Sequence, residues 1–484
     1  MNYKMIGRYL SGILALEAAF MLPALGISLY DRTAHVTSAF LCTIAAILAV
    51  AGLLRLLCRR AEKGFYAKEG MVCVASCWII MSILGCLPFF ISREIPNYID
   101  ALFEIVSGFT TTGSSILVDV ESMSRGLIYW RSFTHWLGGM GVLVFLLAFV
   151  SSKGRNTGFT LHLLRAESPG PIVGKLVPKM RQTAAVMYFL YSFLTIVNII
   201  FLLVGKMPLF DALCTAFGTA GTGGFGIKAD SMASYSPYLQ NVCTVFMLLF
   251  GVNFSCYFLL LLRRFRPVLC DEELRLYVGM FLGSTVLIIL NLRGYYSTFE
   301  ETVRHAAFQV SSIMTTTGFA TDNFDLWPSF SKTILLSLMI VGACAGSTAG
   351  GLKCVRLLLL LKTLRRNVLQ ALSPQKVQAV TLNREPISEK VLANVNSYLT
   401  AYFAIAVLSI LLVSLDGFSI ETNLSAVLSC FNNIGPGLDL VGPASNFSAY
   451  SMGSKLVLIF DMLAGRLEIF PLITFLSPGT WKNA

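Results

Sequence analysis

The sequence predicts an all-α polytopic membrane protein, with ten transmembrane helices and four re-entrant pore loops in a pseudo-four-fold arrangement. Three observations predict this fold class. First, hydrophobic residues make up 55% of the 484 residues and charged residues only 13%, whereas soluble domains carry about 25% charged residues. Second, long apolar stretches follow one another along the whole chain. Third, a short Thr-Gly motif recurs between these stretches.

The apolar stretches define the predicted spans. A helix that crosses the hydrocarbon core needs roughly 17–25 mostly apolar residues. Ten stretches meet this requirement, at 9–29, 36–57, 70–91, 127–150, 184–204, 240–262, 275–292, 331–361, 392–415 and 453–476. The first of them is too long for a cleavable signal peptide and lacks a clear small-residue cleavage site.

Basic residues set the predicted orientation. The formal charge is +11, and its basic clusters occupy 55–68, 153–181, 263–275 and 362–390. Placing these segments in the cytoplasm satisfies the positive-inside rule and puts both termini in the cytoplasm. The membrane is expected to be the cytoplasmic (inner) membrane. Topology thus explains the basic loops without a nucleic-acid partner. The twelve cysteines are scattered and show no zinc-ligand spacing.

A glycine motif recurs four times. Thr-Thr-Thr-Gly occupies 110–113 and 315–318, and divergent copies occupy 218–226 and 430–438. Each copy follows a short segment that opens with an acid, which we interpret as a helix N-cap. The glycines of the four copies are Gly113, Gly223, Gly318 and Gly435, and the acids are Asp100, Asp211, Glu301 and Glu421.

Each short segment is too short to span and lies between two spans. The repeating unit is therefore a helix, a re-entrant half-helix with an irregular return, and a second helix. The chain divides into two N-terminal helices (1–69), pore repeat one (70–150), a cytoplasmic loop (151–183), pore repeat two (184–262), pore repeat three with a broken second helix (263–361), a cytoplasmic loop (362–390) and pore repeat four (391–484).

Irregular backbone at membrane depth is tolerated where it lines water or is buried in protein. Carbonyl oxygens of four such segments around one axis can replace the water shell of a cation. Glycine permits the necessary backbone conformations, and threonine adds oxygens. The predicted cation-filter residues are Thr111, Thr112, Gly113, Thr222, Gly223, Thr316, Thr317, Gly318, Ile434 and Gly435.

The eighth apolar stretch, 331–361, contains the sequence GACAGSTAGG at 342–351. Glycine costs about 1 kcal/mol per helix position relative to alanine, so the helix is expected to unwind there, just below the filter. Close helix packing through small residues is the alternative. The candidate gate residues are Gly342, Gly346, Gly350, Gly351, Lys353 and Arg466.

Arg466 and Glu468 lie inside the last span, with Asp461 nearby. Charges at membrane depth usually face a cavity or a partner. Arg466 either lines the pore or pairs with one of these acids. Lys353 and Arg356 either anchor the cytoplasmic end of the glycine-rich break or are ordinary positive-inside residues.

The four repeats resemble the superfamily of K⁺ transporters that comprises Trk, Ktr and HKT proteins. HWLGGMGVLVF (135–145), GACAGSTAGGLKCVR (342–356) and AGRLEIFPL (464–472) are similar to TrkH-type members, as are the two extra N-terminal spans. The resemblance covers essentially the whole chain. It implies a homodimer with one pore per subunit, and a TrkA-like cytosolic ring of nucleotide-binding regulatory subunits.

The resemblance also implies the transported ion and the way in which its passage is gated. Glycine in all four filters favours K⁺ as the transported ion, the glycine-rich loop obstructs the pore and moves during gating, and Arg466 lies beside the pore. The expected function is gated K⁺ uptake. Alternatives are a cation-coupled (H⁺ or Na⁺) symporter, which a scarcity of membrane-embedded carboxylates disfavours, or a less selective monovalent cation channel.

No nucleophile elbow, metal motif or phosphate loop points to an enzyme. The only ligand expected on this chain is the transported ion, besides membrane lipid around it. No cofactor is expected on the chain itself. Nucleotide is expected to bind only to the partner subunit.

Overall fold

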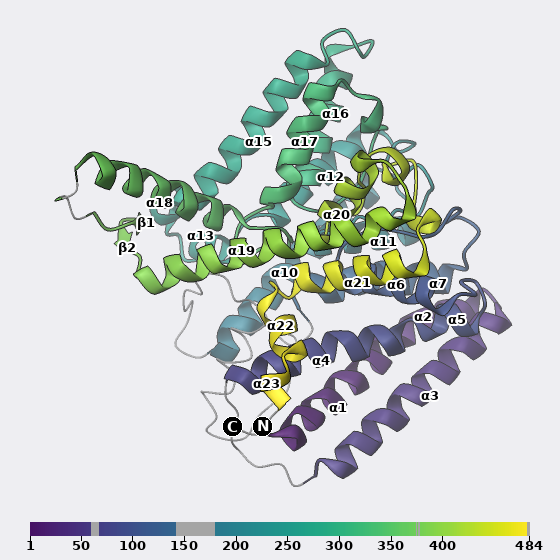
Figure 1. The fold of residues 1–484 in the computed structure, drawn as a ribbon. Coiled ribbons are helices and arrows are strands. Elements are labelled where there is room, and N and C mark those ends of the chain that lie inside the picture. The colour runs from purple at the N-terminus through teal and green to yellow at the C-terminus, as the bar shows by residue number, and fades with distance from the viewer. Residues whose placement is uncertain (60–66, 142–179, 374, 376–377, 482–484) are drawn as a thin grey trace.

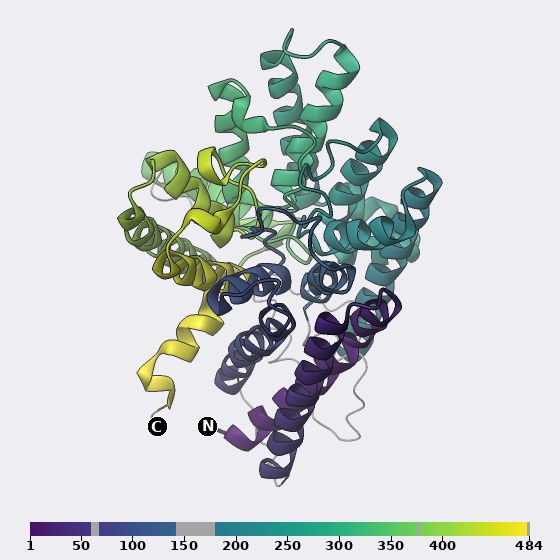
Figure 2. The same ribbon diagram turned by 90° about the vertical axis from the view of Figure 1, so that its right-hand side faces the viewer.

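The computed structural model describes residues 1–59, 67–141, 180–373, 375 and 378–481. It is a helical assembly in which helices of the four repeats surround irregular loops (Figures 1 and 2). The N-terminal region, which the repeats do not include, comprises α1 (Tyr3–Phe20), α2 (Leu22–Tyr30) and α3 (Ala34–Leu57). These helices lie on the outside of the assembly, and α1 packs along α3 and α4.

Repeats one and two each contain a first helix, a short helix before the glycine motif and a second helix. The short helix of each repeat is called its pore helix below, after the function predicted from the sequence. Repeat one comprises α4 (Ala67–Gly85), α5 (Leu87–Ile91), the pore helix α6 (Tyr98–Phe109) and α7 (Arg125–Gly139). Repeat two comprises α10 (Met180–Val204), the pore helix α11 (Leu209–Gly221), α12 (Pro237–Phe250) and α13 (Phe254–Leu261), with α14 (Phe265–Leu269) following.

Repeats three and four have the same order, with a strand pair between them. Repeat three comprises α15 (Glu272–Asn291), the pore helix α16 (Phe299–Met314), η1 (Phe324–Leu326), α17 (Ser329–Val341) and α18 (Cys354–Leu372). The antiparallel strands β1 (Thr381–Leu382) and β2 (Glu385–Pro386) follow. Repeat four comprises α19 (Glu389–Val413), η2 (Ser414–Asp416), the pore helix α20 (Ile420–Phe431), η3 (Asp439–Val441), η4 (Phe447–Ala449), α21 (Met452–Arg466), α22 (Phe470–Leu476) and α23 (Pro478–Trp481).

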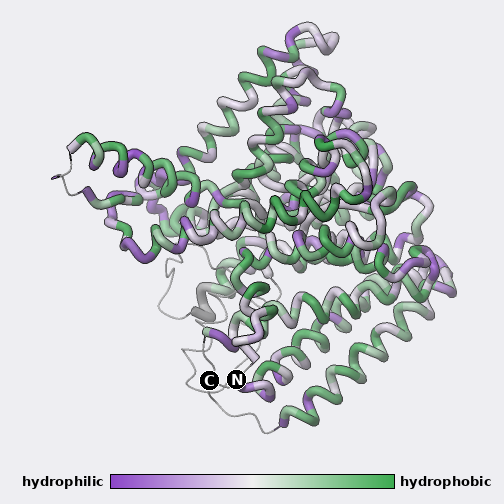
Figure 3. The backbone as a smooth tube through the Cα atoms, viewed as in Figure 1, coloured by the Kyte–Doolittle hydropathy of each residue, from purple (hydrophilic) through white to green (hydrophobic). Residues whose placement is uncertain are grey.

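Long apolar helices make the chain a multi-pass membrane protein. Among the described residues, six helices are long and apolar enough to span, or seven if the bent pair α12–α13 is one span. Apolar residues cover the lengths of these helices, and polar residues gather toward their ends (Figure 3). The other predicted spans, 127–150, 331–361 and 453–476, fall on broken helices or extend beyond the described residues, so the total of ten stays a prediction.

Three of the second helices are broken, but only one of these breaks was predicted from the sequence. The break in repeat three, between α17 and α18, was expected from its glycines. However, α12 and α13 also meet at an 89° bend, and α21 ends at Arg466 before α22 begins at Phe470. In repeat one α7 ends at Gly139, and residues 142–150 lie outside the description.

The acids at the starts of the pore helices are not the N-caps, which corrects the sequence interpretation. Asn97, Thr298 and Ser419 cap α6, α16 and α20 with their side chains, and Pro208 precedes α11. The acids occupy the first turn, where they still stabilise the helix dipole. Only one of the predicted acids, Glu301, takes part in capping, as the partner of Thr298 in a capping box.

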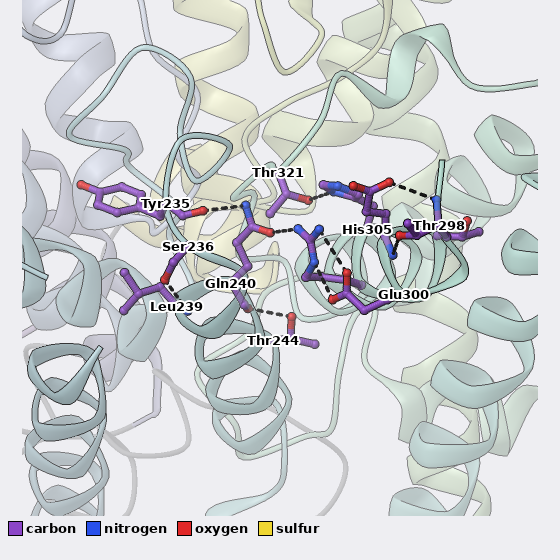
Figure 4. Close-up of polar contacts among 12 residues, drawn as sticks. Tyr235, Ser236, Leu239, Gln240, Thr244, Thr298, Glu300, His305 and Thr321 are labelled. Carbon is purple, nitrogen blue, oxygen red and sulfur yellow. Dashed lines mark hydrogen bonds and ion pairs between the residues drawn. The ribbon is translucent and has the colours of Figure 1, made fainter. Parts of the chain in front are cut away.

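The second helix of one repeat contacts the pore helix of the next. Between repeats one and two, the guanidinium of Arg125 lies 4.6 Å from the centroid of the Phe210 ring. Between repeats two and three, Arg304 of α16 donates a hydrogen bond to the buried Gln240 of α12. Figure 4 shows Gln240 between the loop at Tyr235 and α16.

Contacts between the second helix of one repeat and the pore helix of the next also join repeats three and four, and repeat four to repeat one. Lys332 of α17 donates to Glu421 of α20 at 3.1 Å, which joins repeats three and four. Lys455 of α21 donates to Asp100 of α6 at 2.6 Å, which joins repeat four back to repeat one. The repeats therefore form a closed ring around a central axis, in the chain order seen in Figure 2.

Candidate ion pathway

The four pore helices end in the same unusual backbone conformation. Thr111, Thr222 and Thr316 have φ of 55°, and Asn433 has φ of 56°. Left-handed backbone is rare for a β-branched residue and persists only where the surroundings enforce it, at about 1–3 kcal/mol each. Such strain clusters at functional sites, so its repetition at four equivalent positions marks the site.

Two residues further on, each chain segment has a glycine with positive φ: Gly113 (84°), Gly224 (72°), Gly318 (87°) and Gly435 (109°). At each of these glycines, the space for a side chain is filled by a carbonyl of the next repeat. A Cβ atom would lie 2.0 Å from the Gly223 oxygen at Gly113, and 1.9 Å from the Thr317 oxygen at Gly224.

The pattern continues through repeats three and four. A Cβ atom at Gly318 would lie 2.0 Å from the Ile434 oxygen, and one at Gly435 would lie 2.9 Å from the Thr112 oxygen. The four return loops thus contact one another in a closed cycle. The ring is tight because each contact is between backbones, which cannot move aside as a flexible side chain can.

One pocket opens onto this ring. It is lined by all four of these glycines together with the loops that follow each filter, including Ser115, Phe225, Ala320 and Phe447. A hollow that reaches all four repeats at once is the arrangement expected at the mouth of a central pore.

Comparison with known proteins agrees with this geometry. The sequence model of the TrkH family, described as a cation transport protein, matches residues 36–481. The chain is 34% identical to the Trk system potassium uptake protein TrkH of Salmonella typhimurium, over 100% of both chains. It is 32% identical to the Trk system potassium uptake protein TrkG of Escherichia coli, over 86% of both. The chain belongs to the TrkH family.

The fold agrees as well. The structure matches the crystal structure of the potassium transporter TrkH from Vibrio parahaemolyticus with a TM-score of 0.89, at 30% identity and over 100% of both chains. Because the TrkH family consists of cation transporters, the chain is a transporter and not an enzyme.

The backbone of this TrkH-family chain corrects the sequence alignment of repeat two. Gly224, not Gly223, shares positive φ with the glycines of the other repeats. Gly223 is equivalent to Thr112, Thr317 and Ile434. The sequence carried a usable signal, because Phe225 follows Gly224 as Phe319 follows Gly318.

Gly223 is a glycine for a different reason. A Cβ atom there would lie 2.1 Å from Nδ1 of His135, so the imidazole occupies the space of the missing side chain. His135 is buried, and its Nδ1 lies 2.9 Å from the Gly108 carbonyl oxygen. His135 therefore packs against the return loop of repeat two.

The threonine hydroxyls mostly hold the loops. Thr110 and Thr112 are joined at 2.7 Å between their Oγ1 atoms, and Thr315 and Thr317 repeat this contact at 2.7 Å. In repeat four the Gly435 carbonyl accepts hydrogen bonds from Ser114 (3.0 Å) and Ser429 (2.7 Å). The fourth filter is therefore supported by hydroxyls, although it lacks a threonine of its own.

Outside the ring, Asp439 fixes the loop that follows the fourth filter. Its Oδ2 accepts hydrogen bonds from Ser419 and Thr422, both at 2.6 Å. These hydroxyls lower the pKa of Asp439, because their hydrogen bonds favour the ionised carboxylate.

The break between α17 and α18, residues 342–353, is called the gate loop below. It contacts the return loop of repeat three, because the Gly350 amide donates to the Thr316 hydroxyl at 2.7 Å. It also crosses to the bend of repeat two: the Cys344 amide donates to the Gly251 carbonyl at 3.1 Å, and the Phe254 amide donates to the Gly346 carbonyl at 3.0 Å.

Arg466 connects the gate loop to repeat one. Its guanidinium donates to the Thr348 carbonyl at 2.9 Å and to the Gly139 carbonyl at 2.8 Å, and also to the Gly138 carbonyl. One side chain of repeat four thus reaches the gate loop and the end of α7. Gly342, Gly346, Gly350, Gly351, Lys353 and Arg466, the six candidate gate residues, lie in or against this loop.

The other charges of this region have partners of their own. Glu468 forms an ion pair with Arg356, whose guanidinium lies 3.9 Å from the ring centroid of Tyr398. Asp461 accepts a hydrogen bond from Ser409 at 2.7 Å. Lys353 is buried and donates to the Ala349 carbonyl, so it bonds the gate loop at the end that leads into α18.

A buried ion pair behind the filter was missed at the sequence level. Arg131 of α7 donates to Glu104 of α6 at 2.6 Å, with 2% and 0% of the side chains exposed. Arg131 also donates to the Gly226 carbonyl at 3.1 Å, and Glu104 accepts the Ile116 amide at 2.9 Å. The pair therefore joins the return loops of repeats one and two.

We expect replacement of Arg131 by methionine to destabilise the protein by about 3–5 kcal/mol, because it leaves the Glu104 charge buried without its partner. The control is Arg125→Met on the same helix, whose pair with Asp31 is 52% and 19% exposed and worth about 0–1 kcal/mol. Thermal unfolding in detergent, followed by tryptophan fluorescence, compares the two. Equal midpoints for both variants would contradict a supporting role for the pair.

Proposed function

We propose that the chain mediates K⁺ uptake through the ring of four return loops, with the gate loop controlling passage. The observation that carries the proposal is the closed cycle in which each filter glycine contacts a carbonyl of the next repeat. Backbone oxygens held at fixed positions around an axis can replace the water shell of a cation. The potassium assignment rests on the names of the relatives, which are potassium uptake proteins.

The filter set for this proposal is Thr111, Thr112, Gly113, Thr222, Gly223, Gly224, Thr316, Thr317, Gly318, Ile434 and Gly435. Asn433 joins it as the fourth left-handed residue. The gate loop supports the control step, because it is bonded to the filter, to repeat two and, through Arg466, to repeat one. Opening of the gate loop requires these hydrogen bonds to break together.

Ion flux in proteoliposomes tests the proposal. Purified protein is reconstituted, and K⁺, Rb⁺, Na⁺ and Li⁺ fluxes are compared at fixed voltage. The proposal expects K⁺ and Rb⁺ to pass in preference to Na⁺ and Li⁺. Equal fluxes of the four ions would favour the less selective monovalent cation channel.

Cation-coupled symport is the second candidate function, and one observation favours it. The premise that embedded carboxylates are scarce is wrong, because Glu17, Glu104, Glu273, Asp461 and Glu468 are all buried. Among the described residues, both carboxylate oxygens of Glu17 and the Oδ2 of Asp461 have no hydrogen-bond partner. A proton-coupled mechanism would make uptake depend on the pH gradient and lose that dependence in Glu17→Gln or Asp461→Asn.

We also propose that the protein lies in the cytoplasmic (inner) membrane with both termini in the cytoplasm. The ten-span topology, the four pore repeats and the homodimer belong to the same proposal. In this topology the basic segments 153–181 and 362–390 face the cytoplasm, where a TrkA-like nucleotide-binding subunit can dock. The relatives are named as parts of a Trk system, which supports a partner. Residues 153–179 of the first basic segment lie outside the described residues.

We expect gentle purification from the native cell to recover a nucleotide-binding subunit with this chain, and transport to respond to nucleotide when both are present. Affinity purification, mass spectrometry and flux with and without ATP or NADH measure this. Repeated recovery of the chain alone, with transport indifferent to nucleotide, would rule the partner out.

A further inference from the structure

One carboxylate oxygen binds the gate loop and the helix that follows it. Oε1 of Glu273 accepts the backbone amide of Ala345 at 2.7 Å and that of Val355 at 3.0 Å. Ala345 lies inside the gate loop, and Val355 lies in the first turn of α18. Both amides are buried, so a side chain from the first helix of repeat three spans the break in its second helix.

The helix that carries Glu273 is fixed at its start by the strand pair β1–β2. Asn383, in the turn between the strands, accepts the Glu272 amide through Oδ1 at 2.9 Å. The same side chain donates through Nδ2 to Asp271 at 2.9 Å. Asp271 is the N-cap of α15, so the turn holds the two residues immediately before Glu273.

An apolar cluster joins the same parts. Ala345 of the gate loop and Val355 of α18 pack with Val380 and Leu382 of the hairpin segment, and with residues of α18 and α19. The hairpin therefore touches the gate region twice: through this cluster, and through Asn383 and the start of α15. Movement of the hairpin alters both contacts at once.

We propose that Glu273 is a positioning residue that holds the gate loop closed, and that the β1–β2 hairpin sets its position through Asn383. The inference rests on the gate function proposed above and extends it to the cytoplasmic side. The hairpin lies within the segment 362–390, where the regulatory subunit is proposed to dock. Displacement of the hairpin moves the start of α15, separates Glu273 from Ala345 and Val355, and releases the loop.

Two native thiols report on the loop without a transport measurement. Cys344, in the gate loop, is 1% exposed and Cys354, at the start of α18, is 0% exposed. Release of the loop exposes them to water-soluble maleimide. Peptide mass spectrometry then identifies which cysteine was labelled and how fast, beside Rb⁺ influx in the same proteoliposomes without any partner.

The first variant is Glu273→Gln, which keeps the shape of the side chain and removes its charge. We expect several-fold faster labelling of Cys344 and several-fold higher Rb⁺ influx. Glu389→Gln is the matched control: it is the same change in a side chain that is 73% exposed and pairs with Arg366, and wild-type values are expected. Labelling and influx at control levels in Glu273→Gln would overturn the proposal.

The second variant, Asn383→Ala, removes both bonds to the start of α15 while leaving Glu273 intact. We expect faster labelling than in wild type, and no further increase when it is combined with Glu273→Gln, because both act on one contact. Additive increases would show that Asn383 does not act through Glu273. A variant lacking 343–350 separates the two proposals. If this variant transports at the wild-type rate, the proposed function of the gate loop is wrong. If it transports faster while Glu273→Gln does not, only the proposed role of Glu273 is wrong.

Discussion

Replacing Gly318 by serine is expected to lower the K⁺/Na⁺ selectivity ratio by about tenfold or more. A side chain there would place Cβ 2.0 Å from the Ile434 carbonyl oxygen, in backbone with φ of 87°. The neighbouring filter must move to relieve the contact. Distorting the backbone of the neighbouring repeat costs about 1–3 kcal/mol, and 1.4 kcal/mol is a factor of ten. Gly113→Ser is expected to act in the same way through the Gly223 carbonyl.

Reversal potentials or isotope uptake in K⁺ and Na⁺ measure the effect. Gly294→Ser is the matched control, because Gly294 has the same positive φ of 84° as Gly113 but no atom within 4 Å of its Cβ position. It reproduces the backbone strain without touching the filter. Gly435→Ser is expected to be milder, since its nearest oxygen is at 2.9 Å. Unchanged selectivity in folded Gly113→Ser and Gly318→Ser would refute the filter assignment.

Apolar helices and the irregular segments at the glycine motifs could be predicted because apolar length and glycine motifs are local signals. The register of repeat two could not be read in the same way. Gly223 and Gly224 are adjacent, so either aligns with the other filters, and only the backbone separates the one with positive φ from the one that makes room for His135. Sequence similarity shows where a glycine recurs but not which physical demand it meets.

The breaks in the second helices had unequal sequence signals. Four glycines indicate the gate loop in the sequence, whereas only Gly251 lies at the bend of repeat two. There, the side chain of Asn253 caps the next helix by accepting a hydrogen bond from the Ser255 amide at 2.8 Å. In repeat four the break lies at Glu468 and Ile469, which have positive φ without being glycine. Tertiary contacts impose that conformation, and a local sequence pattern does not encode it.

Long-range polar contacts were the least predictable part of the site. Arg131 and Glu104 were each visible as charges in apolar surroundings, but nothing in the sequence joins two residues that are 27 positions apart. The same holds for Glu273, 72 positions before Ala345. For Arg466, the sequence left a choice between the pore and a nearby acid, and Glu468 is instead paired with Arg356.

Deleting 343–350 from the gate loop is expected to raise K⁺ or Rb⁺ flux by about tenfold or more and to reduce dependence on the regulatory partner. The deletion removes the Cys344, Thr348 and Gly350 contacts at once. The ends are already adjacent: a Cβ at Gly351 would lie 3.0 Å from the Gly342 Cα, so the remaining chain can rejoin without moving α17 from α18.

Arg466→Ala is expected to raise flux in the same direction. It removes a positive charge close to the path of a cation, and it removes hydrogen bonds to the Thr348 and Gly139 carbonyls. Hydrogen bonds from a charged donor are worth about 1.5–3 kcal/mol, enough to shift a closed–open equilibrium by about tenfold. Arg466→Lys keeps the charge but not the planar fork that reaches carbonyls of two repeats, and an intermediate flux is expected.

These variants are compared by single-channel or liposome flux, normalised to folded protein. The control is Ser347→Ala, which removes only a hydrogen bond inside the loop, from the Ser347 hydroxyl to the Cys344 carbonyl at 2.6 Å. No filter residue is replaced in any of these variants, and the deletion removes only one bond to the filter, from the Gly350 amide to the Thr316 hydroxyl. The K⁺/Na⁺ selectivity is therefore expected to stay at the wild-type value while the rate rises. A higher rate with lost selectivity would mean that the loop supports the filter through Thr316 instead of blocking the path. Wild-type flux and regulation in the deletion variant would make the loop a packing element and place the gate elsewhere.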